Sequence, residues 1–183
     1  MNCFYLMTVL LLSSGQAIAA LELNAVSSDA EQFQTQLRDY FFNAARFGDN
    51  EVLDEFIQAG YDLNTADDKG YTALILAAYN GHPDTVERLI AAGANACAQD
   101  ARGNTALMGA IFKGELRIAK RLLATECDPD QRNHAGQPPA MYAALFQRDA
   151  LLQALRERGA DLEASDPMGN KVESLARGEI RTR

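Results

Sequence analysis

The feature that most constrains this chain is a repeat of 33 residues. Shifting the sequence by that distance superimposes Gly70 on Gly103, Gly136 and Gly169, while alanines recur with the same spacing at positions 44, 77, 110, 143 and 176. A fixed period of this size is typical of chains that stack small structural units in a row. A chain of 183 residues has room for about four to five such units, so we predict an array.

Each unit has the pattern of two short helices. Thr72 precedes the first and can accept hydrogen bonds from the amides that follow it. Val86, Leu89 and Ile90 give the second helix an apolar stripe at helical spacing, and Gly93 suits its end. Helices of about nine residues are unstable alone in water, so each pair is expected to pack against its neighbours.

The repeat closely resembles the ankyrin family. The resemblance rests on G-Y-T-A-L-I-L-A-A-Y-N-G-H from Gly70 to His82 and on T-V-E-R-L-I-A-A-G-A-N from Thr85 to Asn95. It extends, with looser copies, roughly over residues 39–177. It implies an all-α solenoid of about four helix-pair repeats with a C-terminal half-repeat as cap.

The period also predicts the domain boundaries. A helix is expected from the Ser28-x-x-Glu31 spacing onward, with its apolar face, made of Phe33, Leu37, Tyr40, Phe41 and Ala44, covering the open end of the array. The expected segments are a signal peptide over 1–19, an N-terminal segment over 20–38, a capping repeat over 39–66, repeats over 67–99, 100–132 and 133–165, and a partial repeat over 166–183.

The N-terminus favours export. The apolar run Cys3–Leu12 is too short to span a bilayer, and it precedes small residues ending at Ala19, as in a cleaved secretory signal. The first basic residue is Arg38, so the usual basic start is missing, and an uncleaved anchor or a misassigned start is the alternative. We expect a periplasmic protein, with extracellular release as a second destination.

Little in the sequence points to chemistry. The net charge of −8 disfavours binding to nucleic acid or to an anionic membrane. No metal, cofactor or catalytic motif occurs, so we expect a monomeric non-enzyme without metal or cofactor. His82 is expected to bond to neighbouring backbone, and Asp67 and Asp68 to stabilise a turn, with a paired-carboxylate site as the alternative.

Two further features leave alternatives open. Cys97 and Cys127 are either a disulfide or two small buried hydrophobic residues. Lys113, Arg117, Lys120 and Arg121 share a helix face that is either simply solvated or a site for an acidic partner.

The resemblance implies where a protein partner binds. Ankyrin-repeat proteins usually bind through loop tips and the exposed edges of first helices, which line a concave surface. Carried onto this sequence, the expected partner-binding residues are Phe47, Asp68, Lys69, Tyr71, Tyr79, Asn80, Arg102, Asn104, Phe112, Lys113, His134, Gln137, Leu145 and Phe146.

Tyr79, Phe112 and Leu145 follow one another at exact repeat spacing, so we expect a row with steps of about 10 Å. Exposed aromatic residues flanked by Lys, Arg and Asn resemble an interface core with a polar rim. The alternative is that these rings belong to the core between repeats.

Together these features predict an exported interaction scaffold without enzymatic activity. Small exported bacterial ankyrin-repeat proteins are in some cases linked to catalase activity and peroxide defence, so the resemblance implies support or protection of a periplasmic enzyme such as a catalase. The alternatives are a secreted effector that binds a host protein and an enzyme.

Overall fold

The computed structural model describes residues 29–181. The chain consists of two units, Met1–Tyr40 and Phe41–Arg183. The predicted signal peptide, residues 1–19, and Ser28 of the predicted helix start lie outside the described residues. In the first unit, residues 29–40 are helical. Phe33 and Tyr40 are 60% and 56% exposed, whereas Phe41 and Ala44 of the second unit are buried. That the whole face covers the open end of the array stays a prediction.

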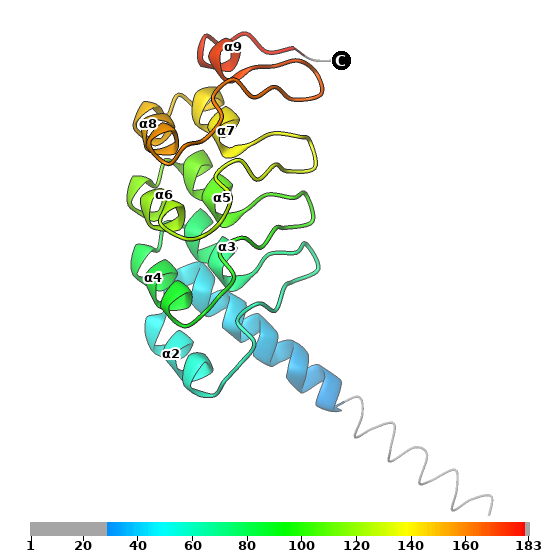
Figure 1. The fold of residues 1–183 in the computed structure, drawn as a ribbon. Helices are drawn as coiled ribbons and strands as arrows, with labels where there is room; N and C mark the ends of the chain where they lie inside the picture. The colour runs from blue at the N-terminus through cyan, green and yellow to red at the C-terminus, as the bar shows by residue number, and fades with distance from the viewer. Residues whose placement is uncertain (1–28, 182–183) are drawn as a thin grey trace, which may run out of the picture. The chain divides into compact units, whose positions relative to one another are not determined.

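The second unit is a stack of helix pairs. Helical residues 41–47 come first, and the labelled helices follow in pairs joined by short turns (Figure 1). They are α2 (Asn50–Gln58), α3 (Ala73–Tyr79), α4 (Pro83–Ala91), α5 (Ala106–Lys113), α6 (Leu116–Leu123), α7 (Pro139–Leu145), α8 (Asp149–Glu157) and α9 (Val172–Ala176). Residues 29–181 contain isolated β-bridges and no β-strand, which confirms the all-α solenoid.

Local sequence explains where the first helices begin. The hydroxyl oxygens of Thr72 and Thr105 accept hydrogen bonds of 3.3 Å from the amides of Ile75 and Met108. Pro139 starts α7, at a position where its missing N–H would have had no helical partner anyway. The predicted helix starts at these positions are therefore correct.

The core lies between the two helix layers and between successive pairs. The α3 helix, with the sequence ALILAAY, buries every residue except Tyr79 at its end. Small alanines permit first helices to lie close together, and Leu53, Leu89 and Leu155 of the second helices are fully buried. At the C-terminus Leu175 of α9 is buried and Ala176 is exposed.

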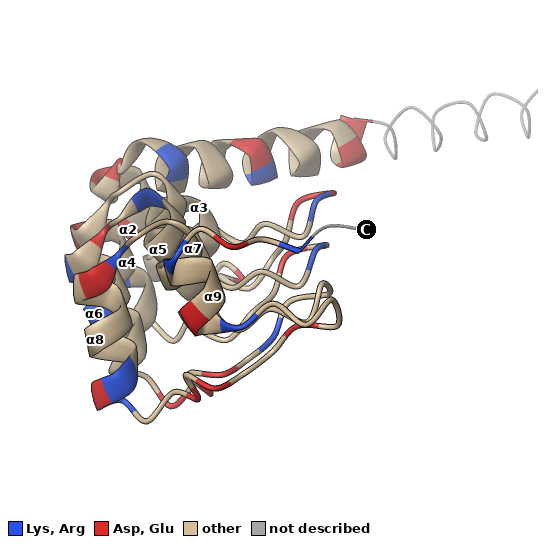
Figure 2. Cartoon of the chain, turned by 90° about the horizontal axis from the view of Figure 1, so that it is seen from above, with Lys and Arg blue, Asp and Glu red and all other residues tan. Residues whose placement is uncertain are grey.

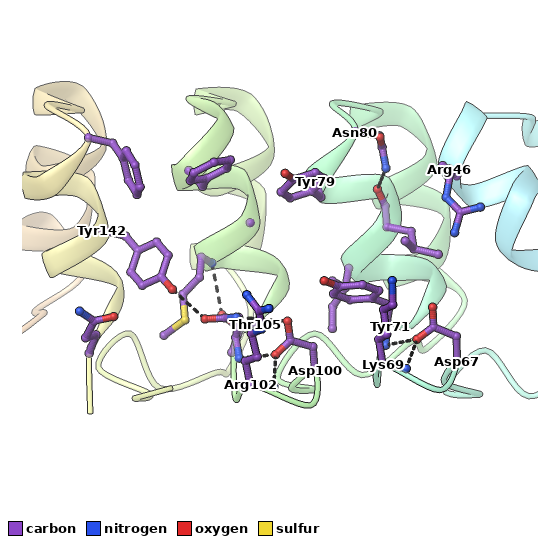
Figure 3. A pocket seen from close by; sticks show the side chains of 18 of the residues that line it. Arg46, Asp67, Lys69, Tyr71, Tyr79, Asn80, Asp100, Arg102, Thr105 and Tyr142 are labelled. Carbon is purple, nitrogen blue, oxygen red and sulfur yellow. Dashed lines mark hydrogen bonds between the residues drawn. The ribbon is translucent and has the colours of Figure 1, made fainter. Parts of the chain in front are cut away.

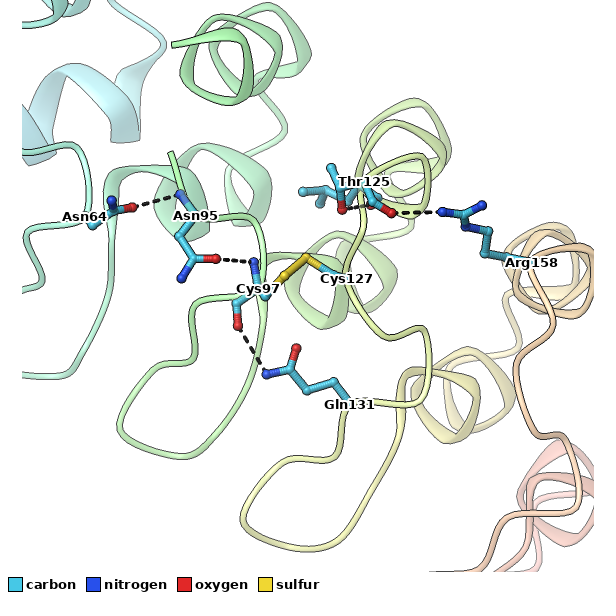
Figure 4. The surroundings of a disulfide bond; sticks show 8 residues. Asn64, Asn95, Cys97, Thr125, Cys127, Gln131 and Arg158 are labelled. Atoms are coloured by element: carbon cyan, nitrogen blue, oxygen red, sulfur yellow. Dashed lines mark hydrogen bonds between the residues drawn. A yellow bond between two sulfur atoms is a disulfide. The ribbon is translucent and has the colours of Figure 1, made fainter. Parts of the chain in front are cut away.

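A disulfide joins the connections that follow α4 and α6. Cys97 and Cys127 are bonded, with their α-carbons 5.4 Å apart (Figure 4). The Gln131 side-chain amide also donates to the Cys97 carbonyl over 3.1 Å. The alternative of two unbonded buried cysteines is therefore wrong, and a covalent link supplements the packing between these repeats.

Within residues 29–181, no helix combines the length and apolar character needed to cross a bilayer.

Candidate functional site

A groove of about 570 Å³ runs along the first helices of the second unit. Residues of α3, α5 and α7 form one side, and the loops that precede these helices form the other. Figure 3 shows Tyr79 on the helix side, with Lys69 and Arg102 on the loop side. The groove therefore crosses several repeats, so its surface changes with the residues at equivalent repeat positions.

An acidic or amide side chain holds each loop in shape. The Asp67 carboxylate accepts from the amides of Lys69 and Tyr71, at 2.9 and 2.8 Å. Asp100, Asn133 and Asp166, at the same repeat position, accept in the same way from the residues two and four places later. These turns are formed before any partner arrives, which confirms the turn assignment for Asp67.

Neighbouring loops are also bonded to each other. The amide of Ala101 donates to the Lys69 carbonyl over 2.8 Å, and that of His134 donates to the Arg102 carbonyl over 2.9 Å. Gly70, with φ of +77°, permits this approach because a β-carbon there would lie 2.6 Å from the Ala101 nitrogen. The loop tips consequently form a continuous, ordered edge of the groove.

Aromatic rings line the helix side. Tyr79 and Phe112 stack with centroids 5.9 Å apart, and Phe112 meets Phe146 edge-on at 4.8 Å. The expected 10 Å step is wrong because the rings lean toward one another, and Phe146 contacts Phe112 from the place next to the periodic Leu145. Tyr79 and Phe112 are 44% and 37% exposed, so the row is accessible while its rings support one another.

A cluster of polar side chains connects Tyr142 of α7 to the loops that carry Asn104 and Asn133. The Tyr142 hydroxyl donates to the Asn104 side-chain oxygen over 2.8 Å and accepts from the Asn133 amide over 3.1 Å. Burial raises the pKa of Tyr142 above its ordinary value, so the phenol stays protonated and keeps donating at neutral pH. This cluster fixes the ring of Tyr142 against the loop that carries Asn104.

The charges that line the groove differ in their surroundings. The lining includes the carboxylates of Asp67 and Asp100, both bonded to their own loops, and the cations of Arg46, Lys69 and Arg102. Among residues 29–181 none of these three cations forms an ion pair. The Lys113 ammonium lies 5.2 Å from the centre of the Tyr79 ring. The lining therefore carries one more cation than carboxylates, in a chain of net charge −8.

The structure brings most of the predicted binding residues together. Those in the groove lining are Lys69, Tyr71, Tyr79, Asn80, Arg102, Asn104, Phe112, Gln137, Leu145 and Phe146. Four others do not line it: Lys113 covers Tyr79, Phe47 and His134 are exposed elsewhere, and Asp68 lies at the loop tip.

Sequence reasoning missed several residues of the groove. They are Asp67 and Asp100, which shape the loops, Arg46, which precedes α2, and Ile75, Leu76, Thr105, Met108, Gly109 and Tyr142 on or beside the first helices. The signal that could have found them is the period, since Leu76, Gly109 and Tyr142 occupy one repeat position. They were missed because the sequence does not show how neighbouring helices pack. Without that packing, a helical position that faces the groove cannot be distinguished from one that faces the core.

The histidines have separate surroundings. A ring nitrogen of His82 lies 2.9 Å from the Arg46 carbonyl oxygen, as predicted for a residue that bonds to neighbouring backbone. His134 is exposed at its loop tip. No group of three or more His, Cys, Asp and Glu residues suited to a metal ion occurs in the part of the chain that the structure describes.

Comparison with known proteins identifies the repeat. A model of ankyrin repeats in three copies matches residues 41–133, just over half of the chain. The match includes α2 to α6 and the loops that carry Lys69 and Arg102. No curated protein matches the chain.

Proposed function

Because the chain belongs to the ankyrin-repeat family, whose repeats form protein–protein interaction modules, we propose that its groove binds a protein partner outside the cytoplasm. The protein acts as a scaffold in the bacterial periplasm and has no enzymatic activity of its own. The observation that carries the proposal is the accessible aromatic row of Tyr79 and Phe112 beside ordered loop tips.

The groove has the physical properties of a preformed binding surface. Stacked rings offer a large apolar area with little side-chain freedom to lose on binding. The loop tips are held by hydrogen bonds within each loop and between loops, so their backbone also loses little freedom. Such a surface binds through a few anchors surrounded by polar contacts.

The disulfide supports the proposed location. Disulfides persist in oxidising compartments such as the periplasm and are rare in the cytosol. The Cys97–Cys127 bond therefore agrees with the export expected from the N-terminal sequence. We propose an exported enzyme as the client, and a catalase is the client that the resemblance implies.

The experiment that tests this proposal is retention of a partner by immobilised protein. The exported protein is purified and attached through its C-terminus to a solid support. It is then incubated with a periplasmic extract of the organism that produces it. A Tyr79→Glu/Phe112→Glu variant is compared with Lys120→Glu, which lies on the exposed face of α6. Both variants lower the net charge by two, so they separate loss of the aromatic surface from a general change of charge.

The expected result is one dominant protein that the wild type and Lys120→Glu retain and the groove variant loses. Retention of that protein by all three would overturn binding through the groove. Cell fractionation accompanies the test, because recovery of the protein only outside the cell would contradict a periplasmic scaffold and favour a secreted effector. Turnover of a substrate by the purified protein would contradict the non-enzymatic role.

A further inference from the structure

The floor of the groove has a gap at one repeat position. Leu76, Gly109 and Tyr142 follow one another at intervals of one period and all line the groove. Leu76 is 6% exposed, and Tyr142 is half-buried with its hydroxyl bonded to Asn104. The middle repeat has a glycine at this position, so it contributes no side chain between its two equivalents, and Tyr79 is the residue nearest to a β-carbon built there.

The backbone of α5 does not require this glycine. A β-carbon added at Gly109 would lie 3.7 Å from the β-carbon of Tyr79, which is ordinary van der Waals contact. Alanine would therefore fit between α3 and α5, and in a helix interior glycine is less favourable than alanine. The glycine weakens the helix locally, and what it provides in return is open space in the groove.

The residues around this gap are mainly apolar. Tyr79 at the end of α3 and Phe112, one turn after Gly109 on α5, stack their rings on each other. Met108 and Leu76 also line the groove. Tyr142, whose hydroxyl is held by Asn104 and Asn133, also lines the groove from α7. A space with aromatic and aliphatic walls favours an apolar side chain, since its burial removes apolar surface from water.

The charged residues that line the groove determine which partner residues fit next to the apolar side chain. Arg46, Lys69 and Arg102 line the groove, and none of them forms an ion pair among residues 29–181. The two carboxylates of the lining, Asp67 and Asp100, are engaged by amides of their own loops. Arg46 donates to the Asn43 side-chain oxygen over 2.7 Å, and the three cations outnumber the two carboxylates of the lining. This rim is complementary to a partner that brings carboxylates of its own.

From these observations we infer that the groove takes an extended acidic segment of a protein, with one apolar or aromatic side chain seated in the gap over Gly109. Carboxylates next to that anchor meet Lys69, Arg102 and Arg46, which line the groove from the residues that precede α5. This inference rests on the proposed function, because it specifies the chemistry of the partner at the same groove. It assigns to Gly109 the role of setting the space for the anchor.

Fluorescent heptapeptides test this chemistry directly. The first has a central phenylalanine flanked on each side by glycine, aspartate and glutamate. The second replaces the phenylalanine by alanine, and the third replaces the acidic residues by lysine. Anisotropy titrations with the exported protein are expected to give an affinity for the first peptide at least tenfold above that for either of the others. Equal affinities, or no binding of the first peptide at about 1 mM, would overturn the inference.

Two protein variants locate the binding. Gly109→Leu introduces the residue that the preceding repeat has at Leu76 and is expected to weaken binding of the first peptide at least tenfold. Gly109→Ala is its matched control, which fits without displacing Tyr79 and is expected to have a much smaller effect. Unchanged affinity in Gly109→Leu would place the anchor elsewhere and overturn the inference. Thermal melting of both variants shows that each remains folded.

Charge reversal separates this inference from the proposed function. Lys69→Glu/Arg102→Glu is expected to exchange the preference, so that the lysine peptide binds and the acidic peptide does not. If the partner retained from the extract is lost in Tyr79→Glu/Phe112→Glu but kept by both Gly109→Leu and the charge-reversed variant, the groove binds a protein by other chemistry. In that case the inference fails and the proposed function stands.

Discussion

The layer of second helices and the groove beside the first helices use their charges in different ways. On the second helices Arg88 pairs with Asp54, and Arg117 and Arg121 of α6 pair with acidic residues of α4, one repeat earlier. In the groove, Lys69 and Arg102 form no ion pair among residues 29–181. Helices α3 and α7 carry no charged residue and α5 carries only Lys113. In the repeats over 67–165 most charges therefore lie on the second helices and the loops (Figure 2).

The comparison shows that the same 33-residue repeat produces ion pairs within the protein on one face and charges open to a partner on the other. On the second helices three arginines each pair with a carboxylate one repeat earlier, so these charges are already engaged within the protein. The basic set predicted from sequence is accordingly divided, since Arg117 and Arg121 are paired and Lys113 lies over Tyr79. In the groove, cations and exposed rings remain available to another molecule.

The largest effect is expected from the buried layer. Leu89→Ala empties a fully buried site of α4 and should lower the free energy of unfolding by about 2–4 kcal/mol, measured by urea denaturation. The matched change in the groove is Phe112→Glu, which removes ring contacts from a side chain 37% exposed and should cost only about 1 kcal/mol. Equal losses would show that the aromatic row belongs to the core.

The disulfide should rank second. Cys97 and Cys127 enclose a segment with a sequence separation of 30, for which chain entropy predicts about 3–4 kcal/mol. We expect Cys97→Ser/Cys127→Ser to lose about 2–3 kcal/mol, because residual structure in the unfolded chain already limits the freedom of this segment. Urea denaturation of the variant and of the wild type with and without reductant measures the loss. A wild type that is insensitive to reductant while the variant is destabilised would point to the serines themselves.

The ion pairs of the second helices should contribute less. Arg121 of α6 pairs with Glu87 of α4, and both side chains are substantially exposed. A double-mutant cycle with Arg121→Ala and Glu87→Ala should give a coupling of about 0.5 kcal/mol that shrinks as salt is added. A coupling that is independent of salt would contradict solvent-exposed pairing on this face.

The smallest effect concerns a loop residue and depends on pH. Burial alone would raise the pKa of Asp166, but hydrogen bonds from Asn170, Met168 and Gly169 outweigh it and hold the pKa below its ordinary value. A lowered pKa in the folded state gives stability that is present above about pH 4 and lost as the pH falls through the folded-state pKa.

Asp166→Asn tests this dependence with a residue that repeat 133–165 already has at the same position, Asn133. The variant should melt slightly below the wild type at pH 7 and at nearly the same temperature at about pH 3. A difference that is constant between the two pH values would show that the charge of Asp166 is not what stabilises this loop.

The sequence alone determined the repeat and most of the local structure. The 33-residue period, the threonines that start α3 and α5, and the positive-φ glycines are local signals, so helices, turns and the family follow from them. Many groove residues could also be named, because loop tips and helix edges are defined by their place in the repeat. The expected signal peptide and the cellular location remain predictions.

Tertiary structure decided what depends on distances between repeats. The pairing of Cys97 with Cys127 required the spacing of two connections, which the period does not encode because the cysteines occupy different repeat positions. The contact of Phe112 with Phe146 and the gap at Gly109 likewise depend on how side chains lean between neighbouring helices. The physical reason is that a repeat specifies the fold of each unit locally, whereas the surface between units arises only when unlike residues at equivalent positions are brought side by side.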